Sequence, residues 1–277
     1  NIFITRNYFT LFLLVLLRKK VIFEVHTDLD FEGRINNFIF KNFKILNSKK
    51  IINLVFITHS LKKNFFEKYK IQPKKFTILS SASDLTWKYP LLKKKKRLKI
   101  GYFGLVNKSR GLDFLCRLSH IDQENKYYIF GGTKENINSV KKKIFHKNIF
   151  FKEFLPYKKI KELMCEMDIL VLPYKKKISA SGNFGDIAQF TSPMKLFDYL
   201  GSTKPIIASS LPVLKEVLTN KINCIFVEEL NVLRWKLIIK KLSNNSQLRK
   251  IIAKNNFFHS KNYTYRKRVD KMFKSLL

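Results

Sequence analysis

The feature that most constrains the fold is an alternation of short β-branched or aromatic runs with helical patterns, which begins at Leu98. Such an alternation is typical of a parallel sheet wrapped by helices. The runs that predict strands are Leu98–Phe103, Tyr127–Phe130, Ile149–Phe151, Ile169–Leu172, Ile206–Ala208 and Cys224–Val227. Between them, Ile160, Leu163, Met164 and Met167 have the spacing of one helix face. The sequence therefore predicts a doubly wound α/β domain in the second half of the chain.

The first part of the chain repeats this alternation. Its predicted strands are Ile2–Thr5, Lys20–Val25, Leu54–Thr58 and Phe76–Leu79, and its predicted helices lie near 7–18, 34–46 and 60–69. Four strands are few for such a domain, so we expect its start to be missing. Tyr89-Pro90 and the basic run up to Arg97 predict a domain boundary, because proline ends regular structure and charge favours solvent. The predicted domains are 1–90, truncated, and 91–262, with a closing helix over 263–277 that crosses back to the first.

The strongly basic composition restricts the binding partners only loosely. With 55 Lys plus Arg against 20 Asp plus Glu, the formal charge of the 277 residues is +35. This charge attracts polyanions such as nucleic acid, anionic lipid and phosphorylated metabolites, although a general bias toward Lys, Asn, Ile and Phe explains it as well. Nucleic-acid binding would require aromatic side chains interleaved with Lys and Arg, or a recognisable reading helix. The sequence has neither pattern, so we expect no nucleic acid as a partner.

Metal and membrane signals are also weak. The cysteines, Cys116, Cys165 and Cys224, lack the paired spacing of zinc sites or redox pairs, and no His or carboxylate cluster has the spacing of metal ligands. We therefore expect no metal and a reducing compartment. The apolar run from Phe9 to Leu17 is well short of the ~20 residues that cross a bilayer, so we expect a cytoplasmic protein.

Three loops that follow predicted strands are candidates for a ligand site. The strand Leu98–Phe103 leads into Gly104–Gly111 and a helix, a junction where backbone N–H groups and the helix dipole attract anions. Lys108 and Arg110 lie in the same turn, although two glycines seven residues apart are equally compatible with a plain connection. Gly131-Gly132 and the loop Phe154–Pro156 follow the next two strands. Because the carboxyl ends of parallel strands share one edge, we expect all these loops to face one crevice.

The stretch 191–209, TSPMKLFDYLGSTKPIIAS, predicts a further helix that starts at the same edge. Ser192 is a favourable N-cap, Pro193 a favourable first helical residue, and Gly201 a favourable left-handed stop. The polar loop of roughly twenty residues that precedes this helix is unusually long, which favours a functional role.

Together, Gly104–Asp113 and SPMKLFDYLGSTKPIIASSLPVLKEVL (192–218) resemble the retaining family-4 glycosyltransferases over nearly the whole chain. This resemblance implies the GT-B fold, in which two Rossmann-like domains, acceptor-side and donor-side, face each other across a cleft. It also implies metal-independent transfer of a sugar, of hexosyl type, from a nucleotide-sugar donor to an acceptor hydroxyl. The nucleotide sugar is then a substrate, and no cofactor is expected.

The resemblance further implies roles for individual residues. Gly104, Gly111, Arg110 and Lys108 would hold the donor diphosphate, and the two cations would stabilise it as it leaves. Thr191, Ser192 and Lys195 would lie near the phosphates or the sugar, and Asp198 would accept hydrogen bonds from the ribose. His26, which follows a strand, would lie near the transferred sugar, with His59 a weaker candidate, whereas Glu24 receives no role. The candidate catalytic residues are thus His26, Arg110 and Lys108. The candidate donor-binding residues are Gly104, Gly111, Thr191, Ser192, Lys195 and Asp198.

The sequence departs from the family pattern at two positions. Leu105 stands where many members have Arg after the phosphate-loop glycine, and Phe190 replaces the first of two acids eight positions apart, leaving Asp198 as the second. These departures keep open an alternative, a truncated or inactive protein that binds nucleotide sugars. The resemblance also suggests a glycan or lipid-linked acceptor in the synthesis of cell-envelope polysaccharide, lipopolysaccharide or glycolipid. Peripheral contact with an anionic membrane is a further hypothesis, which the basic surface suits.

Overall fold

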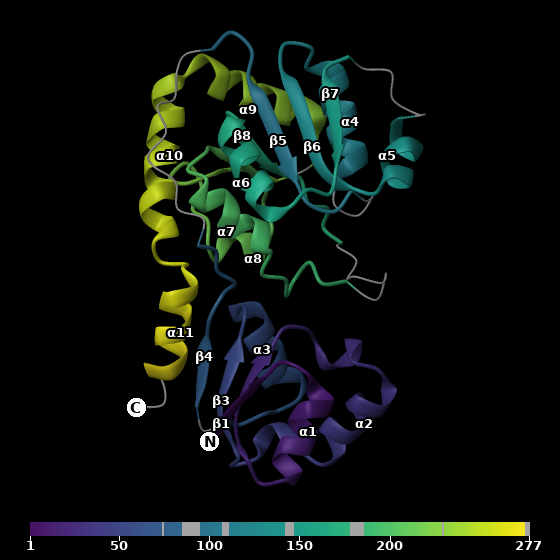
Figure 1. Ribbon diagram of the computed structural model, residues 1–277, viewed down its shortest axis with the longest axis vertical. Coiled ribbons are helices and arrows are strands. Elements are labelled where there is room, and N and C mark those ends of the chain that lie inside the picture. The colour runs from purple at the N-terminus through teal and green to yellow at the C-terminus, as the bar shows by residue number, and fades with distance from the viewer. Residues whose placement is uncertain are drawn as a thin grey trace. The chain divides into compact units, whose positions relative to one another are not determined.

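The computed structural model describes residues 1–73, 75–84, 95–106, 111–141, 147–177, 186–228 and 230–274 (Figure 1). The chain divides into two compact units. Unit 1 comprises Asn1–Ala82, Ser179–Pro193 and Tyr263–Leu277, and unit 2 comprises Ser83–Ile178 and Met194–Asn262. Each unit is a parallel sheet with helices, so the predicted α/β class with two Rossmann-like domains is confirmed. The predicted boundary at Tyr89-Pro90 lies outside the described residues.

The sheet of unit 2 has the strand order β10-β9-β8-β5-β6-β7, with all neighbours parallel. Its strands are β5 (Lys99–Phe103), β6 (Lys126–Gly132), β7 (Ile149–Glu153), β8 (Ile169–Leu172), β9 (Ile206–Ser209) and β10 (Ile225–Val227). The chain winds outward from β5 in one direction through β7, and then in the other direction from β8 through β10. The order of strands therefore reverses between β5 and β8, which makes the carboxyl edge at this pair a topological switch point.

Helices connect these strands and bury the sheet. They are α4 (Leu112–Ile121), α5 (Lys134–Lys141), α6 (Tyr157–Glu166), α7 (Met194–Gly201), α8 (Pro212–Lys215), α9 (Val232–Asn244) and α10 (Ser246–Ser260). Phe114 on α4 and Trp235 on α9 are fully buried, and their rings meet edge to face with centroids 5.1 Å apart. Such a pair adds about 0.5–1.5 kcal/mol beyond the burial of its area, and it fixes α4 and α9 over one face of the sheet.

The sheet of unit 1 has the order β1-β2-β3-β4 and is also parallel. Its elements are β1 (Ile2–Thr5), α1 (Tyr8–Leu16), β2 (Lys20–Val25), the short 3₁₀ helix η1 (Leu29–Phe31), α2 (Arg34–Asn42), a second 3₁₀ helix η2 (Ile45–Asn47), β3 (Ile51–Phe56), α3 (His59–Lys68) and β4 (Phe76–Ile78). Val21, Phe23 and Val25 alternate along β2 and pack into one core with residues of α1, α2 and α3. This alternation leaves Ile22 and Glu24 on the other face.

The third strand begins and ends earlier than the expected Leu54–Thr58. Ile51 is buried and pairs with Val21, which extends β3 at its start. At its other end, the Thr58 hydroxyl accepts a hydrogen bond from the backbone N–H of Leu61 at 3.1 Å. Thr58 is thus the N-cap of α3 rather than the last residue of the strand.

The closing helix α11 (Tyr265–Lys274) covers the second face of the unit 1 sheet. Met272 is buried there with Ile22, Val55 and Leu79, and Figure 1 shows α11 next to β4. The last helix of the chain therefore completes the core of the first sheet.

In the part of the chain that the structure describes, no helix combines the length and the apolar character that crossing a membrane would require. The apolar run that begins at Phe9 forms most of α1, which has nine residues. Tyr8 and Leu11 anchor this helix in the core of unit 1.

Candidate donor site

The candidate site of unit 2 lies at the carboxyl edge of its sheet, where β5 and β8 are neighbours. Gly104 follows β5 directly, and Pro173 and Tyr174 follow β8. Open α/β sheets bind ligands at this position, because the connections from the two central strands leave in opposite directions.

Lys195, on the first turn of α7, lies against the backbone at the end of β5. Gly104 has a φ of 142°, and a Cβ added to it would lie 2.5 Å from Lys195 Nζ. This ammonium group donates a hydrogen bond to the hydroxyl of Tyr102 at 3.0 Å and is 4.1 Å from the centroid of the same ring. It also lies 5.1 Å from the ring centroid of Tyr174. The absence of a side chain at Gly104 thus leaves room for a positive charge at the switch point.

Two other glycines allow the surrounding loops to approach one another closely. A Cβ on Gly111 would lie 2.0 Å from the carbonyl oxygen of Pro173, which joins the start of α4 to the loop after β8. Gly111 is also the N-cap of α4, with a φ of 82°. A Cβ on Gly131, at the end of β6, would lie 2.5 Å from the carbonyl oxygen of Gly104. At Gly111 and Gly131 a larger residue would not fit without moving the backbone, whereas at Gly104 it would displace the end of the Lys195 side chain.

Asp198 presents a carboxylate one helical turn after Lys195. Its Oδ1 accepts hydrogen bonds from the hydroxyls of Ser83 and Tyr157, both at 2.6 Å. Tyr157 is the first residue of α6, so the loop after β7 also reaches this site. Residues three apart lie on the same side of a helix and are separated by roughly 4.5 Å along its axis. One face of α7 therefore offers a cation and a hydrogen-bond acceptor together, which suits a ligand that carries both phosphate and hydroxyl groups.

Comparison with known protein families identifies the family of this part of the chain. A family model described as "Glycosyl transferases group 1" matches residues 97–245, more than half of the chain, and includes both the loop after β5 and α7. The chain belongs to the group 1 glycosyl transferases. No significant match is found among curated proteins.

Solved structures show that this glycosyltransferase has the GT-B fold. HepE from Anabaena, in complex with UDP and glucose, matches with a TM-score of 0.73 at 12% identity, over 99% of this chain and 76% of that one. Sucrose-phosphate synthase from Thermosynechococcus elongatus has a TM-score of 0.74 at 11% identity, over 99% and 72% of the two chains. WaaG, a glycosyltransferase involved in lipopolysaccharide biosynthesis, has a TM-score of 0.60 at 14% identity, over 79% and 61%.

The structure brings together some, but not all, of the residues that are predicted to bind the donor. Gly104, Gly111, Lys195 and Asp198 lie around the switch point of unit 2, as described above. Lys108 and Arg110 lie outside the described residues.

Thr191 and Ser192 belong to unit 1, although only Pro193 separates Ser192 from α7. Ser192 Oγ accepts a hydrogen bond from the backbone N–H of Ser81 at 2.9 Å, and the hydroxyl of Ser81 donates to the carbonyl of Ser192, also at 2.9 Å. The side chain of Ser192, which was expected to cap α7, therefore forms a hydrogen bond with Ser81 in the structure.

The limits of α7 also differ from the prediction. The helix begins at Met194, one residue after Pro193. Gly201 is its last residue and is not left-handed, so the predicted stop is wrong. The N–H of Ser202 still bonds to the carbonyl of Asp198 at 2.8 Å, which extends the helical ladder past Gly201. Thr203, with a φ of 56°, is the residue that takes the left-handed conformation.

In unit 1, the candidate catalytic residue His26 follows β2 directly. His26 Nε2 lies 3.0 Å from Glu24 Oε2, and the other oxygen of Glu24 accepts a hydrogen bond from Arg268 Nη1 at 2.8 Å. Burial opposes ionisation of Glu24, but hydrogen bonds from His26 and Arg268 outweigh it and lower the pKa of this carboxyl to about 2. Glu24 is therefore a fixed negative charge beside His26. His59 is exposed at the start of α3.

Phe190, which replaces an acid of the family pattern, packs against the core of unit 1. Its carbonyl oxygen accepts a hydrogen bond from Thr58 Oγ1 at 3.2 Å. The partly buried aromatic side chain at this position thus has a packing role.

Several residues of the site could not be predicted from the sequence. Tyr102 and Tyr157 contact Lys195 and Asp198, but nothing in their local sequence indicates these partners. Glu24 could have been found, because residues two apart in a strand lie on the same face and Glu24 is two residues before His26.

Among the described residues, no group of three or more His, Cys, Asp or Glu side chains is arranged to hold a metal ion.

Proposed function

We propose that this glycosyltransferase is a retaining enzyme of the family-4 type, which moves a hexosyl group from a nucleoside diphosphate sugar to an acceptor hydroxyl. The observation that carries the proposal is that Lys195 and Asp198 lie on the same face of α7, at the switch point of unit 2. An ammonium group suits a diphosphate, and a carboxylate suits the two hydroxyls of a ribose.

The donor would lie with its diphosphate beside Gly104 and Lys195. The N-terminus of α4, which begins after Gly111, adds backbone N–H groups and a positive dipole end. We propose that Asp198 accepts hydrogen bonds from the ribose, and that ligand binding replaces its contact with the exposed Tyr157 while Ser83 continues to hold the carboxylate. The similarity to HepE, whose structure is a complex with UDP and glucose, supports a nucleotide sugar as the donor.

In the proposed reaction, the bond between the anomeric carbon and the diphosphate oxygen breaks as the acceptor oxygen bonds to the same carbon. The acceptor hydroxyl passes its proton to the departing diphosphate oxygen, which leaves with the electron pair of the broken bond. Lys195 would stabilise this charge together with Arg110 and Lys108, and Thr191 and Ser192 would lie near the sugar. Because protein cations supply the neutralising charge, we propose that the enzyme needs no metal. His26, oriented by Glu24, is the proposed contact to the transferred sugar.

We further propose a glycan or lipid-linked acceptor in the synthesis of cell-envelope polysaccharide, lipopolysaccharide or glycolipid. The similarity to WaaG supports this class of acceptor. The proposed location is the cytoplasm, at the inner face of the membrane, since a formal charge of +35 favours anionic lipid surfaces. Salt-sensitive co-sedimentation with anionic vesicles tests the membrane contact, and absence of such binding would refute it.

A thermal-shift screen against UDP, GDP, ADP and CMP, with and without attached sugars, tests the donor site. A ligand that binds the native state must raise the melting temperature, and we expect this for one nucleoside diphosphate. Lys195→Met and Asp198→Asn should abolish the shift, whereas Lys254→Met and Asp270→Asn, which change exposed residues on α10 and α11, should retain it.

Activity then separates the enzyme from the alternative of an inactive binding protein. Release of nucleoside diphosphate in the presence of acceptor supports the enzyme, and binding without any transfer supports the alternative. Proton NMR of the product reports whether the anomeric configuration is retained, and inversion would contradict the family-4 assignment. Full activity in the presence of EDTA is expected if no metal takes part.

A further inference from the structure

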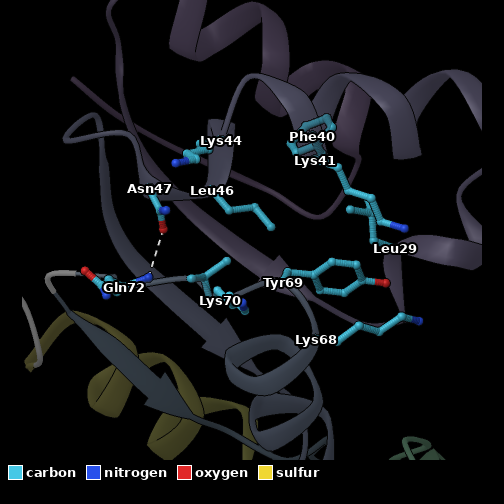
Figure 2. A pocket seen from close by; sticks show the side chains of 11 residues that line it. Leu29, Phe40, Lys41, Lys44, Leu46, Asn47, Lys68, Tyr69, Lys70 and Gln72 are labelled. Carbon is cyan, nitrogen blue, oxygen red and sulfur yellow. Dashed lines mark hydrogen bonds between the residues drawn. The ribbon is translucent and has the colours of Figure 1, made fainter.

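A basic cavity of about 550 Å³ lies in unit 1, and its described lining includes none of the residues assigned to the donor site (Figure 2). Its size is within the range of small-molecule sites. The lining residues are Leu29, Phe40, Lys41, Lys44, Leu46, Asn47, Lys68, Tyr69, Lys70, Ile71 and Gln72. Four of these described residues are lysines, and none of them is acidic.

The cavity lies away from the sheet edge that carries His26. Except for Leu29, its lining residues are in the last turn of α2 or α3, or in the segments that lead from these helices into β3 and β4. In a parallel sheet, such segments lie at the amino ends of the strands, opposite the edge that follows β2 and β3. The cavity is therefore distinct from the site proposed for the transferred sugar.

One end of the cavity is already neutralised by acidic residues. Lys68 donates hydrogen bonds to Asp28 and Asp30, and Lys41 donates to Asp30 at 3.2 Å. The hydroxyl of Tyr69 donates to Asp28 as well. Figure 2 shows Lys41, Lys68 and Tyr69 together on one side of the cavity.

The other end has positive charge without such partners. Within the described ranges, neither Lys44 nor Lys70 forms an ion pair with a carboxylate. Asn47 and Gln72 lie at the same end, and Asn47 Oδ1 accepts the backbone N–H of Gln72 at 2.9 Å (Figure 2). This bond uses the oxygen of the Asn47 amide, so its NH₂ group is the end that remains to donate.

The backbone at the two lysines is unusual. Lys44 has a φ of 47° and Lys70 a φ of 48°, and they follow the C-caps of α2 and α3. Glycine or asparagine is preferred at such a left-handed position, because other side chains are strained there. A helix C-terminus does favour a nearby cation, but lysine at both positions also adds two basic side chains to the lining of one cavity.

We propose that this cavity binds a phosphate ester, with the phosphate between Lys44 and Lys70 and the organic group toward Leu46 and Ile71. Two ammonium groups and the amide of Asn47 provide more hydrogen-bond donors than the two oxygens of a carboxylate would use. These three donor groups match the three terminal oxygens of a phosphate. The ester can come from a soluble metabolite or from the headgroup of a lipid, and the experiment distinguishes the two.

Phosphorus NMR and calorimetric titrations of the full chain with inorganic phosphate and glycerol 3-phosphate test the proposal. Sedimentation with phosphatidylcholine vesicles, with and without phosphatidic acid, forms the second arm. Binding of glycerol 3-phosphate in solution indicates a soluble ester, and binding only to phosphatidic acid vesicles indicates a lipid headgroup. No binding in either arm would overturn the proposal.

Lys44→Asn/Lys70→Asn is the informative variant, because asparagine tolerates the left-handed backbone and keeps the fold while both charges are lost. We expect roughly tenfold weaker binding for each lysine removed, the lower range for a charged hydrogen bond. Lys19→Asn/Lys20→Asn removes the same charge elsewhere in unit 1 as a control. Equal weakening by both variants would mean that only net charge attracts the ligand, and it would also refute the site. The nucleotide response of the donor site should be unchanged in either variant, so failure here leaves the proposed function untouched.

Discussion

Glu24 Oε2 lies 3.0 Å from His26 Nε2, and its second oxygen accepts a hydrogen bond from Arg268 Nη1 at 2.8 Å. Arg268 belongs to α11 and also donates from Nε to the carbonyl of Ser80 at 3.1 Å. The ring of His26 is thus held by a carboxylate that is itself held by the last helix of the chain. A side chain near the C-terminus therefore fixes a candidate catalytic residue in the N-terminal sheet.

Glu24 should make the stability of the protein sensitive to acid. Its pKa in the folded state is about 2 instead of 4.5, so its contribution is complete above pH 4.5 and is lost as the pH falls toward 2. Between pH 6 and pH 3 the loss is on the order of 2 kcal/mol. Urea unfolding of the wild type and of Glu24→Gln at both pH values measures this loss. It is the amount by which the unfolding free energy of the wild type falls more than that of Glu24→Gln between pH 6 and pH 3. Glu67→Gln, on the exposed face of α3, is the control, and an unchanged acid sensitivity in Glu24→Gln would contradict the assignment.

Gly111→Ala should disturb the candidate site through the backbone. The new Cβ would lie 2.0 Å from the carbonyl oxygen of Pro173, which cannot move unless the loop after β8 moves. Gly33→Ala is a suitable control, because Gly33 also has a positive φ, 87°, but has nothing within 4 Å of an added Cβ. We expect Gly33→Ala to lose about 1–3 kcal/mol of unfolding free energy from backbone strain alone.

Gly111→Ala should lose more than Gly33→Ala, and it should also lose its thermal response to the nucleotide. Differential scanning fluorimetry with and without the nucleotide measures both effects. A nucleotide response in Gly111→Ala equal to that in Gly33→Ala would show that the approach to Pro173 is not needed for the site.

The sequence predicted the architecture better than the contacts, and the reason is physical. The strands of unit 2 could be predicted because hydrophobic periodicity is local, and so could the sheet edge, because parallel strands end on one side. The partner of Lys195 is Tyr102, 93 positions earlier, and the partner of Glu24 is Arg268, 244 positions later. Such contacts depend on how helices pack on sheets, which a single sequence does not encode in its local pattern. Thr203, rather than Gly201, takes the left-handed conformation for the same reason, since the end of α7 depends on its hydrogen-bond ladder.

Ser83 and Tyr157 should position Asp198 to different degrees. Both hydroxyls donate to Asp198 Oδ1 at 2.6 Å, but Ser83 is buried whereas Tyr157 is half exposed. A buried hydrogen bond to a charged group contributes about 1.5–3 kcal/mol, and water replaces an exposed one. We therefore expect Ser83→Ala to weaken nucleotide binding roughly tenfold and Tyr157→Phe only slightly, by calorimetric titration. The reverse order would indicate that the ligand contacts Tyr157 directly.

Gly104→Ala should act on the donor site through Lys195. The added Cβ would lie 2.5 Å from Nζ and 2.9 Å from Cε of this lysine, and the flexible end of the side chain would move before the backbone does. We expect a loss of about 1–3 kcal/mol in unfolding free energy from the φ of 142°, and tenfold to hundredfold weaker nucleotide binding, roughly the value of a charged hydrogen bond.

A double-mutant cycle isolates the part that Lys195 carries, because residues in contact give effects that do not add. If Gly104→Ala weakens binding by displacing the ammonium group, then Gly104→Ala/Lys195→Met should bind the nucleotide no more weakly than Lys195→Met alone. Calorimetric titration of the four proteins measures this coupling. Fully additive losses would mean that Gly104 acts through its own backbone on the ligand, and that the position of Lys195 does not depend on the missing side chain.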